Sequence, residues 1–269
     1  MPLFLQSVII MPTILFDKII FGPIHSRRLG VSLGVNLLPA DGKFCSFNCI
    51  YCECGLNEER RTHSQLPTRQ QVQKALQEKL ISMQQEGICP DVITFAGNGE
   101  PTMHPAFGAI IDDTIETRNR YCPKAKIAVL SNSTMLHKPD VFDALNKIED
   151  NILKLDSVLD SRIQQLNAPN SPSFTFEKLL EQLKRFHGNV IIQTMFLRGQ
   201  HKGESVDNTT EEEINGWLEA LKQINPKQVM IYTIDRETPV HSLQKVPKEE
   251  LETIADRARA FGFNLSVSG

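Results

Sequence analysis

The stretch from Asp91 to Thr102, DVITFAGNGEPT, joins two patterns that together decide the fold. Its first half is a short β-branched run of the kind that forms a buried strand. Its second half is rich in glycine and polar residues and follows the strand directly. In sheets of parallel strands, binding and catalytic groups lie in the loops that follow the strands. The stretch therefore predicts a parallel sheet with a functional site at the carboxyl ends of its strands.

Strands and helices alternate on both sides of this stretch. Further strands are predicted at KIAVLS, NILKLD, NVIIQTMFL and KQVMIYTI, and VSLGVNLL before the cysteines is predicted to be the first strand. A helix precedes the stretch, with apolar residues on one face at Val72, Ala75, Leu76, Leu80 and Met83. Strand and helix at this spacing are typical of βαβ units in a parallel sheet. About six such units are too few for a closed eight-stranded barrel, which leaves an open partial barrel or a doubly wound sheet.

The last two helices have clear signals of their own. Thr210 and Glu213 form a capping box, which predicts the start of a helix. The final helix is predicted to end at Gly262 and to bury Leu251, Ile254, Ala255, Ala258 and Phe261.

The size and composition of the chain favour one large α/β domain. It has 269 residues, of which 41% are hydrophobic and 23% charged, and its formal net charge is -3. We predict a domain over residues 21–269 after an N-terminal extension over residues 1–20, with Met1 or Met11 as the starting methionine. No apolar run approaches the roughly 20 residues that cross a bilayer, and no secretory signal is recognisable. We therefore predict a cytoplasmic protein with no membrane contact, and the charge gives no reason to expect nucleic acid.

Four of the six cysteines lie in one short segment, CSFNCIYCEC from Cys45 to Cys54. Because cytoplasmic thiols stay reduced, this group favours a metal centre over disulfides. Cys45, Cys49 and Cys52 have the spacing C-x3-C-x2-C, which lets one loop surround a single centre. Structural zinc takes four protein ligands, whereas a cubane iron–sulfur cluster held by three cysteines leaves one iron open to a ligand. The cluster is favoured, and the alternative is a non-catalytic zinc- or cluster-binding interaction protein on an α/β scaffold.

The cysteine spacing, with Tyr51 before the last cysteine, resembles the signature of the radical S-adenosylmethionine (SAM) enzymes. The segment GNGEP resembles the Gly-Gly-Glu-Pro segment of that family, which lies along the methionine part of SAM. LSNST and KLD end the next two strands, where relatives contact the ribose and carboxylate of SAM. We therefore predict the α/β class, with a partial (β/α)6 TIM-like barrel of parallel strands.

A narrower resemblance covers the chain from about Gly22 to Asp156. GPIHSRRLGVSLGVNLLP, CSFNCIYCECG, GNGEPTMHP and KLD together are similar to the branch that includes the wyosine-type tRNA synthases. Those synthases carry a second cluster on cysteines nearer the N-terminus, whereas no cysteine precedes Cys45 here. The substrate therefore stays open between a small molecule, a protein and a tRNA.

The family resemblance implies an enzyme and a set of site residues. A [4Fe–4S] cluster on Cys45, Cys49 and Cys52 would cleave SAM reductively to a 5′-deoxyadenosyl radical, which abstracts hydrogen from the substrate. The electron would come from a one-electron reductant of the flavodoxin or ferredoxin type. Glycines allow close backbone approach to a ligand, and a glutamate can pair with an ammonium group. The implied cofactor-binding residues are Tyr51, Gly97, Asn98, Gly99, Glu100, Asn132, Lys154 and Asp156.

Several cysteines and histidines have an ordinary structural interpretation. Cys54, Cys89 and Cys122 are isolated, and free cysteines most often pack as small apolar residues. His25 and His104 lie near the motifs, and we expect hydrogen-bonded structural histidines at both positions.

Four charged residues and one amide have two interpretations each. Arg27 and Arg28 form either a solvated basic pair or a contact to the cofactor carboxylate or a substrate phosphate. Lys154 and Asp156 are expected to point the same way from a strand, where they neutralise one another or bind the cofactor. Gln193, on an otherwise apolar strand, is a weaker candidate for the same site.

Overall fold

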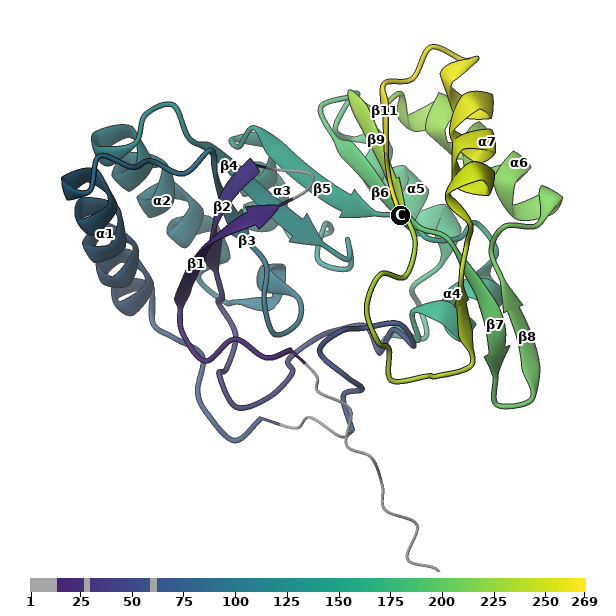
Figure 1. Cartoon of the computed structure of the whole chain (residues 1–269), viewed down its shortest axis with the longest axis horizontal. Coiled ribbons are helices and arrows are strands. Elements are labelled where there is room, and N and C mark those ends of the chain that lie inside the picture. Colours follow the sequence, from purple (N-terminus) through teal and green to yellow (C-terminus); the bar gives the residue numbers. More distant parts are fainter. Residues whose placement is uncertain (1–13, 27–29, 59–61) are drawn as a thin grey trace, which may run out of the picture.

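The computed structural model describes residues 14–26, 30–58 and 62–269. Its centre is an eight-stranded sheet with the strand order β1-β2-β3-β4-β5-β6-β9-β11 (Figure 1). The strands are β1 Ile20–Ser26, β2 Gly30–Val35, β3 Val92–Phe95, β4 Lys126–Ser131, β5 Asp150–Lys154, β6 Ile191–Met195, β9 Gln228–Tyr232 and β11 Leu265–Ser268. All neighbouring pairs are parallel except β1 with β2. This arrangement confirms the predicted α/β partial barrel.

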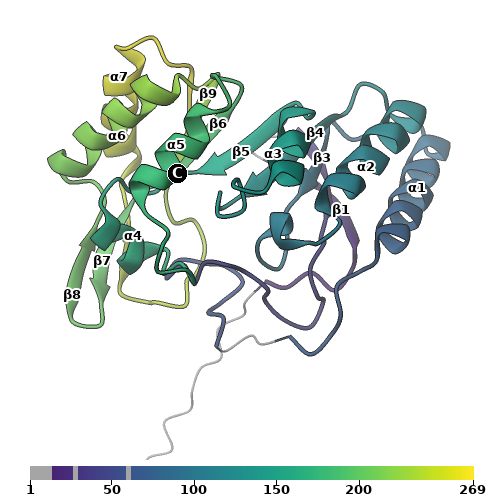
Figure 2. The ribbon, with the colours of Figure 1, turned by 180° about the vertical axis from the view of Figure 1, so that it is seen from behind.

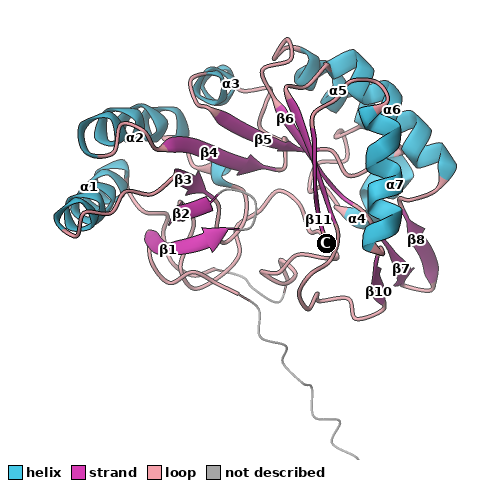
Figure 3. Cartoon of the chain, turned by 45° about the horizontal axis from the view of Figure 1, so that its top comes forward, coloured by secondary structure: helices cyan, strands magenta, loops and turns pink. Residues whose placement is uncertain are grey.

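Helices cover the outer face of the curved sheet (Figure 3). Seen from behind, α1, α2 and α3 cover one half of this face and α5, α6 and α7 the other (Figure 2). A large apolar core fills the space between sheet and helices. The helices are α1 Arg69–Gln85, α2 Phe107–Tyr121, α3 Pro139–Asn146, α4 Asp160–Leu166, α5 Phe176–Lys184, α6 Glu211–Ile224 and α7 Lys248–Arg259, with a 3-10 turn η1 at Pro101–Met103.

The inner face of the sheet is filled near the amino ends of its strands. Small and medium apolar side chains from neighbouring strands form a separate buried cluster there, made of Val92, Ala128, Ile152, Ile191 and Met230. The carboxyl ends carry polar residues instead. The space available to a ligand therefore lies toward the carboxyl ends.

The structure contains more strands than the sequence pattern predicts. β1 is a bulged antiparallel edge strand that contains Gly22 and Pro23, which mask its strand pattern. A second sheet has the order β10-β7-β8, with β7 Leu197–His201, β8 Glu204–Asp207 and β10 Leu243–Lys245. The predicted strand NVIIQTMFL is therefore divided, because β6 ends at Met195 and β7 starts a hairpin in the second sheet.

The described part of the predicted N-terminal extension packs against the barrel. The Ile14 N–H donates to the Glu53 carbonyl at 3.1 Å, and the Phe16 N–H donates to Asn98 Oδ1 at 2.8 Å. Residues 1–13, and with them the choice between Met1 and Met11, lie outside the described residues. The division at residue 20 stays a prediction.

Two side-chain predictions are wrong. Phe261 is 52% exposed, because α7 ends at Arg259 and the ring lies under the Lys222 ammonium, 3.9 Å from its centroid. Cys89 and Cys122 are not isolated but form a disulfide across a sequence separation of 33. One precedes β3 and the other follows α2, so the βαβ unit brings them together. No helix in the described ranges is long and apolar enough to cross a membrane.

Candidate active site

A cavity of about 480 Å³ opens at the carboxyl ends of the parallel strands. The thiol loop, Cys45–Cys54, forms one wall, and the segments at the carboxyl ends of β3, β4 and β5 form another. Ile24 and Gly269 reach it from the two edges of the sheet. Because the cavity draws on nearly every strand end, it is where groups distant in the sequence meet. We call it the main cavity.

The main cavity is lined by the three cysteines of the C-x3-C-x2-C motif. Cys45, Cys49 and Cys52 are free thiols, and each is buried or half-buried. The loop that carries them is fixed by main-chain bonds, including Ile50 N–H to the Leu166 carbonyl at 3.0 Å. Phe47 and Ile50 pack in an apolar cluster that includes Leu166, Met195, Leu197 and Val206. Main-chain hydrogen bonds and apolar packing therefore both position the loop.

Polar groups are directed at the thiols. Asn132 Nδ2 lies 3.6 Å from Cys45 Sγ, and Asn167 Nδ2 lies 3.5 Å from Cys49 Sγ. Lys43 is buried and donates to the Gly55 carbonyl at 2.8 Å. Amide donors and a nearby ammonium favour the thiolate form, which is the form that binds metal.

The thiols differ in acidity. Burial raises the pKa of Cys45 and of Cys49. A hydrogen bond from the Cys54 thiol lowers the pKa of Cys52 to about 6, and the Lys43 ammonium acts in the same direction. Cys54 Sγ also lies 3.4 Å from the Gly97 carbonyl, which is an alternative acceptor for its single hydrogen. Cys54 thus lowers the pKa of Cys52 although it lies outside the C-x3-C-x2-C spacing.

The number of thiols bears on the kind of metal centre that they could hold. Among the described residues, no group of three or more Cys, His, Asp or Glu side chains could hold a single metal ion. A cubane cluster has a different requirement, because each thiolate binds a separate iron. Three cysteines match the ligand number of a cluster with one open iron, whereas a structural zinc ion takes four protein ligands.

Glu100 is a buried carboxylate in the wall of the main cavity. It accepts hydrogen bonds from the Asn132 N–H at 2.6 Å, the Ser131 hydroxyl at 2.8 Å and the Thr102 N–H at 3.1 Å, and also from the Thr102 hydroxyl. Burial raises the pKa of its carboxyl, although these bonds oppose the shift. All of these donors are neutral, so a cationic ligand group beside it would be stabilised.

The glycines beside Glu100 make room for protein atoms. Gly97 and Gly99 have φ of +150° and +138°, and a side chain on either would collide with Asn36 or with the Phe44 main chain. Both glycines also line the main cavity. Their positive φ explains why glycine is needed there.

Asn98, between these glycines, faces away from the main cavity. It is fully buried, and its Nδ2 donates to the carbonyls of Phe16 at 2.9 Å and Pro39 at 2.8 Å. The side chain of Asn98 is thus occupied by protein partners, and a cofactor contact at this residue stays a prediction. Asn98 instead anchors the N-terminal segment.

Asn132 connects the end of β4 with the thiol loop. Its Nδ2 donates to Ser46 Oγ at 2.9 Å, and its Oδ1 accepts from the Thr134 N–H at 3.1 Å. The residue also lines the main cavity, so it is placed both beside Cys45 and beside a bound ligand.

Tyr51, Lys154 and Asp156 form one cluster. The Tyr51 hydroxyl donates to Asp156, and Lys154 Nζ lies 3.6 Å from Asp156 Oδ2 and 5.2 Å from the centre of the Tyr51 ring. Asn167 Nδ2 donates to both Tyr51 and Asp156. The Asp156 side chain is wholly buried among these partners, and a cofactor contact at Asp156 stays a prediction. Burial opposes the charge of Lys154, but Asp156 raises its pKa, so the amine stays protonated.

The histidine and arginine candidates have different outcomes. His104 Nε2 donates to the Pro67 carbonyl at 2.8 Å, and burial lowers its pKa, as expected of a neutral structural histidine. His25 lines the main cavity. Arg27 and Arg28 lie outside the described residues.

Two residues at the thiols escape prediction from the sequence. Lys43 gave a signal, because a lysine two positions before the first cysteine is well placed to offset thiolate charge. Asn167 gave no such signal, because it follows α4 and lies 118 positions from Cys49 in the sequence. Only the packing of α4 against the thiol loop brings it there.

Fold and site together define a class: a partial parallel barrel with three free cysteines at its mouth. The model of the radical SAM superfamily matches residues 41–212, and the chain belongs to that superfamily. Members of the superfamily use a [4Fe–4S] cluster and SAM, and act as SAM-cleaving radical enzymes.

Curated relatives share most of the chain. A UPF0026 protein of Methanocaldococcus jannaschii is 32% identical over 87% of this chain and 69% of its own length. A UPF0026 protein of Helicobacter pylori is 29% identical over 87% of this chain and 71% of its own length.

Solved structures share the fold at low sequence identity. SuiB of Streptococcus suis, crystallised with SAM, superimposes with a TM-score of 0.60 at 14% identity, over 85% of this chain. The chain spans about half of SuiB, 49% of its length. TYW1 with a lysine–pyruvate adduct gives a TM-score of 0.59 at 14% identity, covering 85% of this chain and 73% of TYW1. Likenesses at this identity show the fold alone.

Proposed function

We propose that this protein is a radical SAM enzyme whose cluster is held by Cys45, Cys49 and Cys52 and whose SAM lies in the main cavity. The observation that carries the proposal is the convergence of three free thiols on a cavity that also contains a buried carboxylate, Glu100. The amide donors support thiolate ligands, and a set of three cysteines supports a cluster over structural zinc, which takes four protein ligands.

When bound, the reduced cluster supplies the electron that splits SAM into methionine and a 5′-deoxyadenosyl radical, which takes hydrogen from a substrate. The chain's own residues bind and orient. Glu100 is placed to pair with the ammonium of the methionine part, because its present donors are all neutral. Lys154 stays protonated beside the Tyr51 ring and is placed for an anionic or polar ligand group. Asn132 and the backbone at Gly97 and Gly99 complete the proposed SAM contacts.

The proposal also includes an electron source and a substrate. A one-electron reductant of the flavodoxin or ferredoxin type suits a cluster, and the enzyme would act as an oxidoreductase or transferase in the cytoplasm. The resemblance of Gly22 to Asp156 to the wyosine-type synthases stays a prediction, and the substrate class stays open between tRNA, protein and small molecule. The curated relatives reported above are named only as UPF0026 proteins.

Anaerobic reconstitution tests the proposal. We expect about four irons per chain, and formation of 5′-deoxyadenosine when SAM and dithionite are added. One zinc per chain and no SAM cleavage would instead support the non-catalytic interaction protein. The matched control is a chain with Cys45, Cys49 and Cys52 replaced by alanine, which retains Cys54 and the disulfide.

A further inference from the structure

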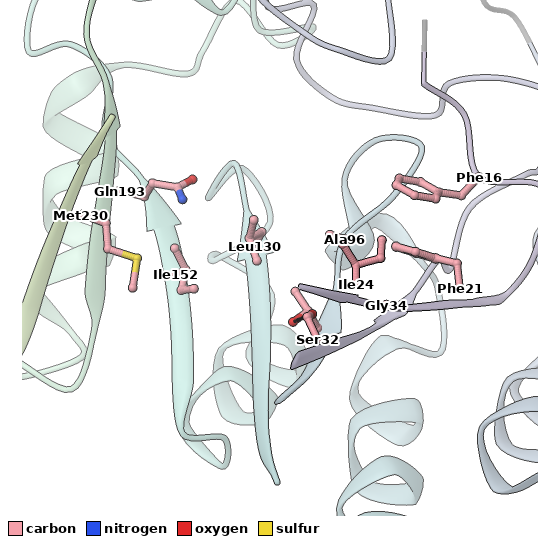
Figure 4. Close-up of a pocket in the computed structure, with 11 residues that line it drawn as sticks. Phe16, Phe21, Ile24, Ser32, Gly34, Ala96, Leu130, Ile152, Gln193 and Met230 are labelled. Atoms are coloured by element: carbon pink, nitrogen blue, oxygen red, sulfur yellow. Dashed lines mark hydrogen bonds between the residues drawn. The ribbon is translucent and has the colours of Figure 1, made fainter. Parts of the chain in front are cut away.

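A second, smaller cavity adjoins the main cavity inside the barrel (Figure 4). Its volume is about 170 Å³, and it shares Ile24, Ala96, Leu130 and Gln193 with the main cavity. It lies on the inner face of the sheet, where it is lined by residues of β2, β3, β4, β5, β6 and β9. We call it the inner cavity.

The inner cavity is lined by uncharged groups. Its walls are mainly apolar, with Leu130, Ile152 and Met230 on the strands and the stacked rings of Phe16 and Phe21, 3.8 Å apart, on the N-terminal segment. None of the described residues that line it is ionisable. An apolar protein cavity of about 150 Å³ is large enough for a benzene ring. The space therefore suits a flat, neutral group and disfavours a charged one.

Gln193 is the polar exception on the strand side. The residue is 6% exposed, and within the described chain no hydrogen bond is formed by its side-chain amide. Gln193 lies in the middle of β6, and Figure 4 shows its amide turned toward the space beside Leu130 and Ile152. Burying an amide without a partner is costly, and most buried amides are hydrogen-bonded. The Gln193 amide is not among the unpartnered atoms that are sealed from solvent, so a ligand group in the cavity can replace water on it.

Two hydroxyl groups lie on the opposite strands. Ser32 Oγ and Thr94 Oγ1 are 2.8 Å apart and share one hydrogen bond. Since each hydroxyl has one hydrogen, the pair retains a second hydrogen that it can donate. The inner cavity thus offers neutral hydrogen-bonding groups on two sides of an apolar space.

We infer that the inner cavity binds an uncharged, flat apolar part of the substrate that bears an amide or carbonyl group, with Gln193 as the binding residue. This inference rests on the proposed function, because it places that group beside the SAM site. It disfavours substrates whose buried part is a phosphate or carboxylate, since no cation among the described lining residues would compensate the charge.

The test uses fluorinated probes and the cluster-loaded enzyme with SAM bound. Fluorine NMR titrations compare 4-fluorobenzamide, 4-fluorotoluene and 4-fluorobenzoate. We expect the amide to bind more tightly than the toluene, and the benzoate to bind at least roughly tenfold more weakly than the amide. Equal binding of benzoate and benzamide would overturn the inference, as would loss of all probe binding when SAM is added, because the inner cavity would then belong to SAM.

Two variants locate the probe. Gln193→Leu keeps the side-chain size and should weaken 4-fluorobenzamide roughly three- to tenfold, while 4-fluorotoluene binds as well or better. Ile152→Phe fills the inner cavity without touching the main one and should abolish binding of both probes. Gln228→Leu, at the amino end of β9 and outside both cavities, is the matched control and should leave all affinities unchanged. Unchanged probe selectivity in Gln193→Leu would contradict the inference.

The same titrations on metal-free protein separate this inference from the proposed function. If no cluster forms but the benzamide preference persists and depends on Gln193, the proposed function is wrong and the inference about the inner cavity is supported. If the cluster forms and SAM is cleaved but the probes show no such preference, only the inference about the inner cavity is wrong.

Discussion

The two ends of the same parallel strands bury different kinds of groups. At the amino ends, Val92, Ala128 and Ile191 close the barrel with hydrocarbon. At the carboxyl ends, Glu100, Asn132 and Lys154 place a carboxylate, an amide and an ammonium around a cavity. Apolar packing stabilises a fold wherever it occurs. Burying polar groups costs free energy, and a ligand bound in the cavity can offset part of that cost. The difference indicates that one end holds the barrel together and the other end is available for chemistry.

The largest effect is expected from removing a cluster ligand at the carboxyl end. Cys45→Ala should abolish iron incorporation after anaerobic reconstitution, because two thiolates remain where three irons need ligands. Iron analysis and the visible absorption of the cluster measure this. Full iron content in Cys45→Ala would remove Cys45 from the ligand set. The apo form of the variant should unfold at the same urea concentration as the apo wild type.

The opposite pattern is expected at the amino end. Ile191→Ala should lower the free energy of unfolding by about 2–5 kcal/mol, since it leaves a cavity in a packed layer. Urea unfolding of the metal-free chain measures this without the linked loss of the cluster. The folded variant should still incorporate iron. An unchanged urea midpoint would show that this layer does not stabilise the barrel as proposed.

A smaller effect, on SAM binding, is expected to distinguish Glu100 from Asn98 in the GNGEP segment. Glu100→Gln should retain iron but weaken SAM binding by roughly 1.5–3 kcal/mol, through loss of a charge-assisted hydrogen bond. Calorimetric titration with SAM measures the change. Unchanged affinity would remove Glu100 from the SAM site.

Asn98→Ala is the comparison for that experiment, because Asn98 bonds to Phe16 and Pro39 rather than to the cavity. It should lower the free energy of unfolding by about 1–3 kcal/mol. Its SAM affinity should equal that of the wild type, and a loss comparable to that in Glu100→Gln would show that the whole motif acts as one unit.

The smallest effect is expected at Cys54. Cys54→Ala should leave the iron content essentially unchanged, since Cys54 hydrogen-bonds to Cys52 rather than standing in the C-x3-C-x2-C spacing. Iron analysis beside Cys45→Ala gives the direct comparison. If Cys54→Ala loses its iron while Cys45→Ala keeps it, the ligand assignment is reversed.

Local patterns predicted the parallel strands because burial on both faces makes such strands uniformly apolar. KIAVLS corresponds to β4 without error, and Thr210 caps α6 as predicted. The pattern failed for β1, where Gly22 and Pro23 interrupt an edge strand, and for the hairpin β7–β8. Edge strands and hairpins outside the main sheet have less burial, and therefore a weaker sequence signal.

The sequence by itself determined the α/β class, the strand ends and the three clustered cysteines, because periodicity and ligand spacing are local properties of a chain. Only the tertiary structure decided which motif residues reach the main cavity. Asn98 and Asp156 turn inward to protein partners, whereas Asn167 arrives at Cys49 from α4. The pairing of Cys89 with Cys122 and the position of the Gln193 amide at the inner cavity were decided in the same way. Side-chain partners depend on which segments pack together, and that packing is a property of the whole chain.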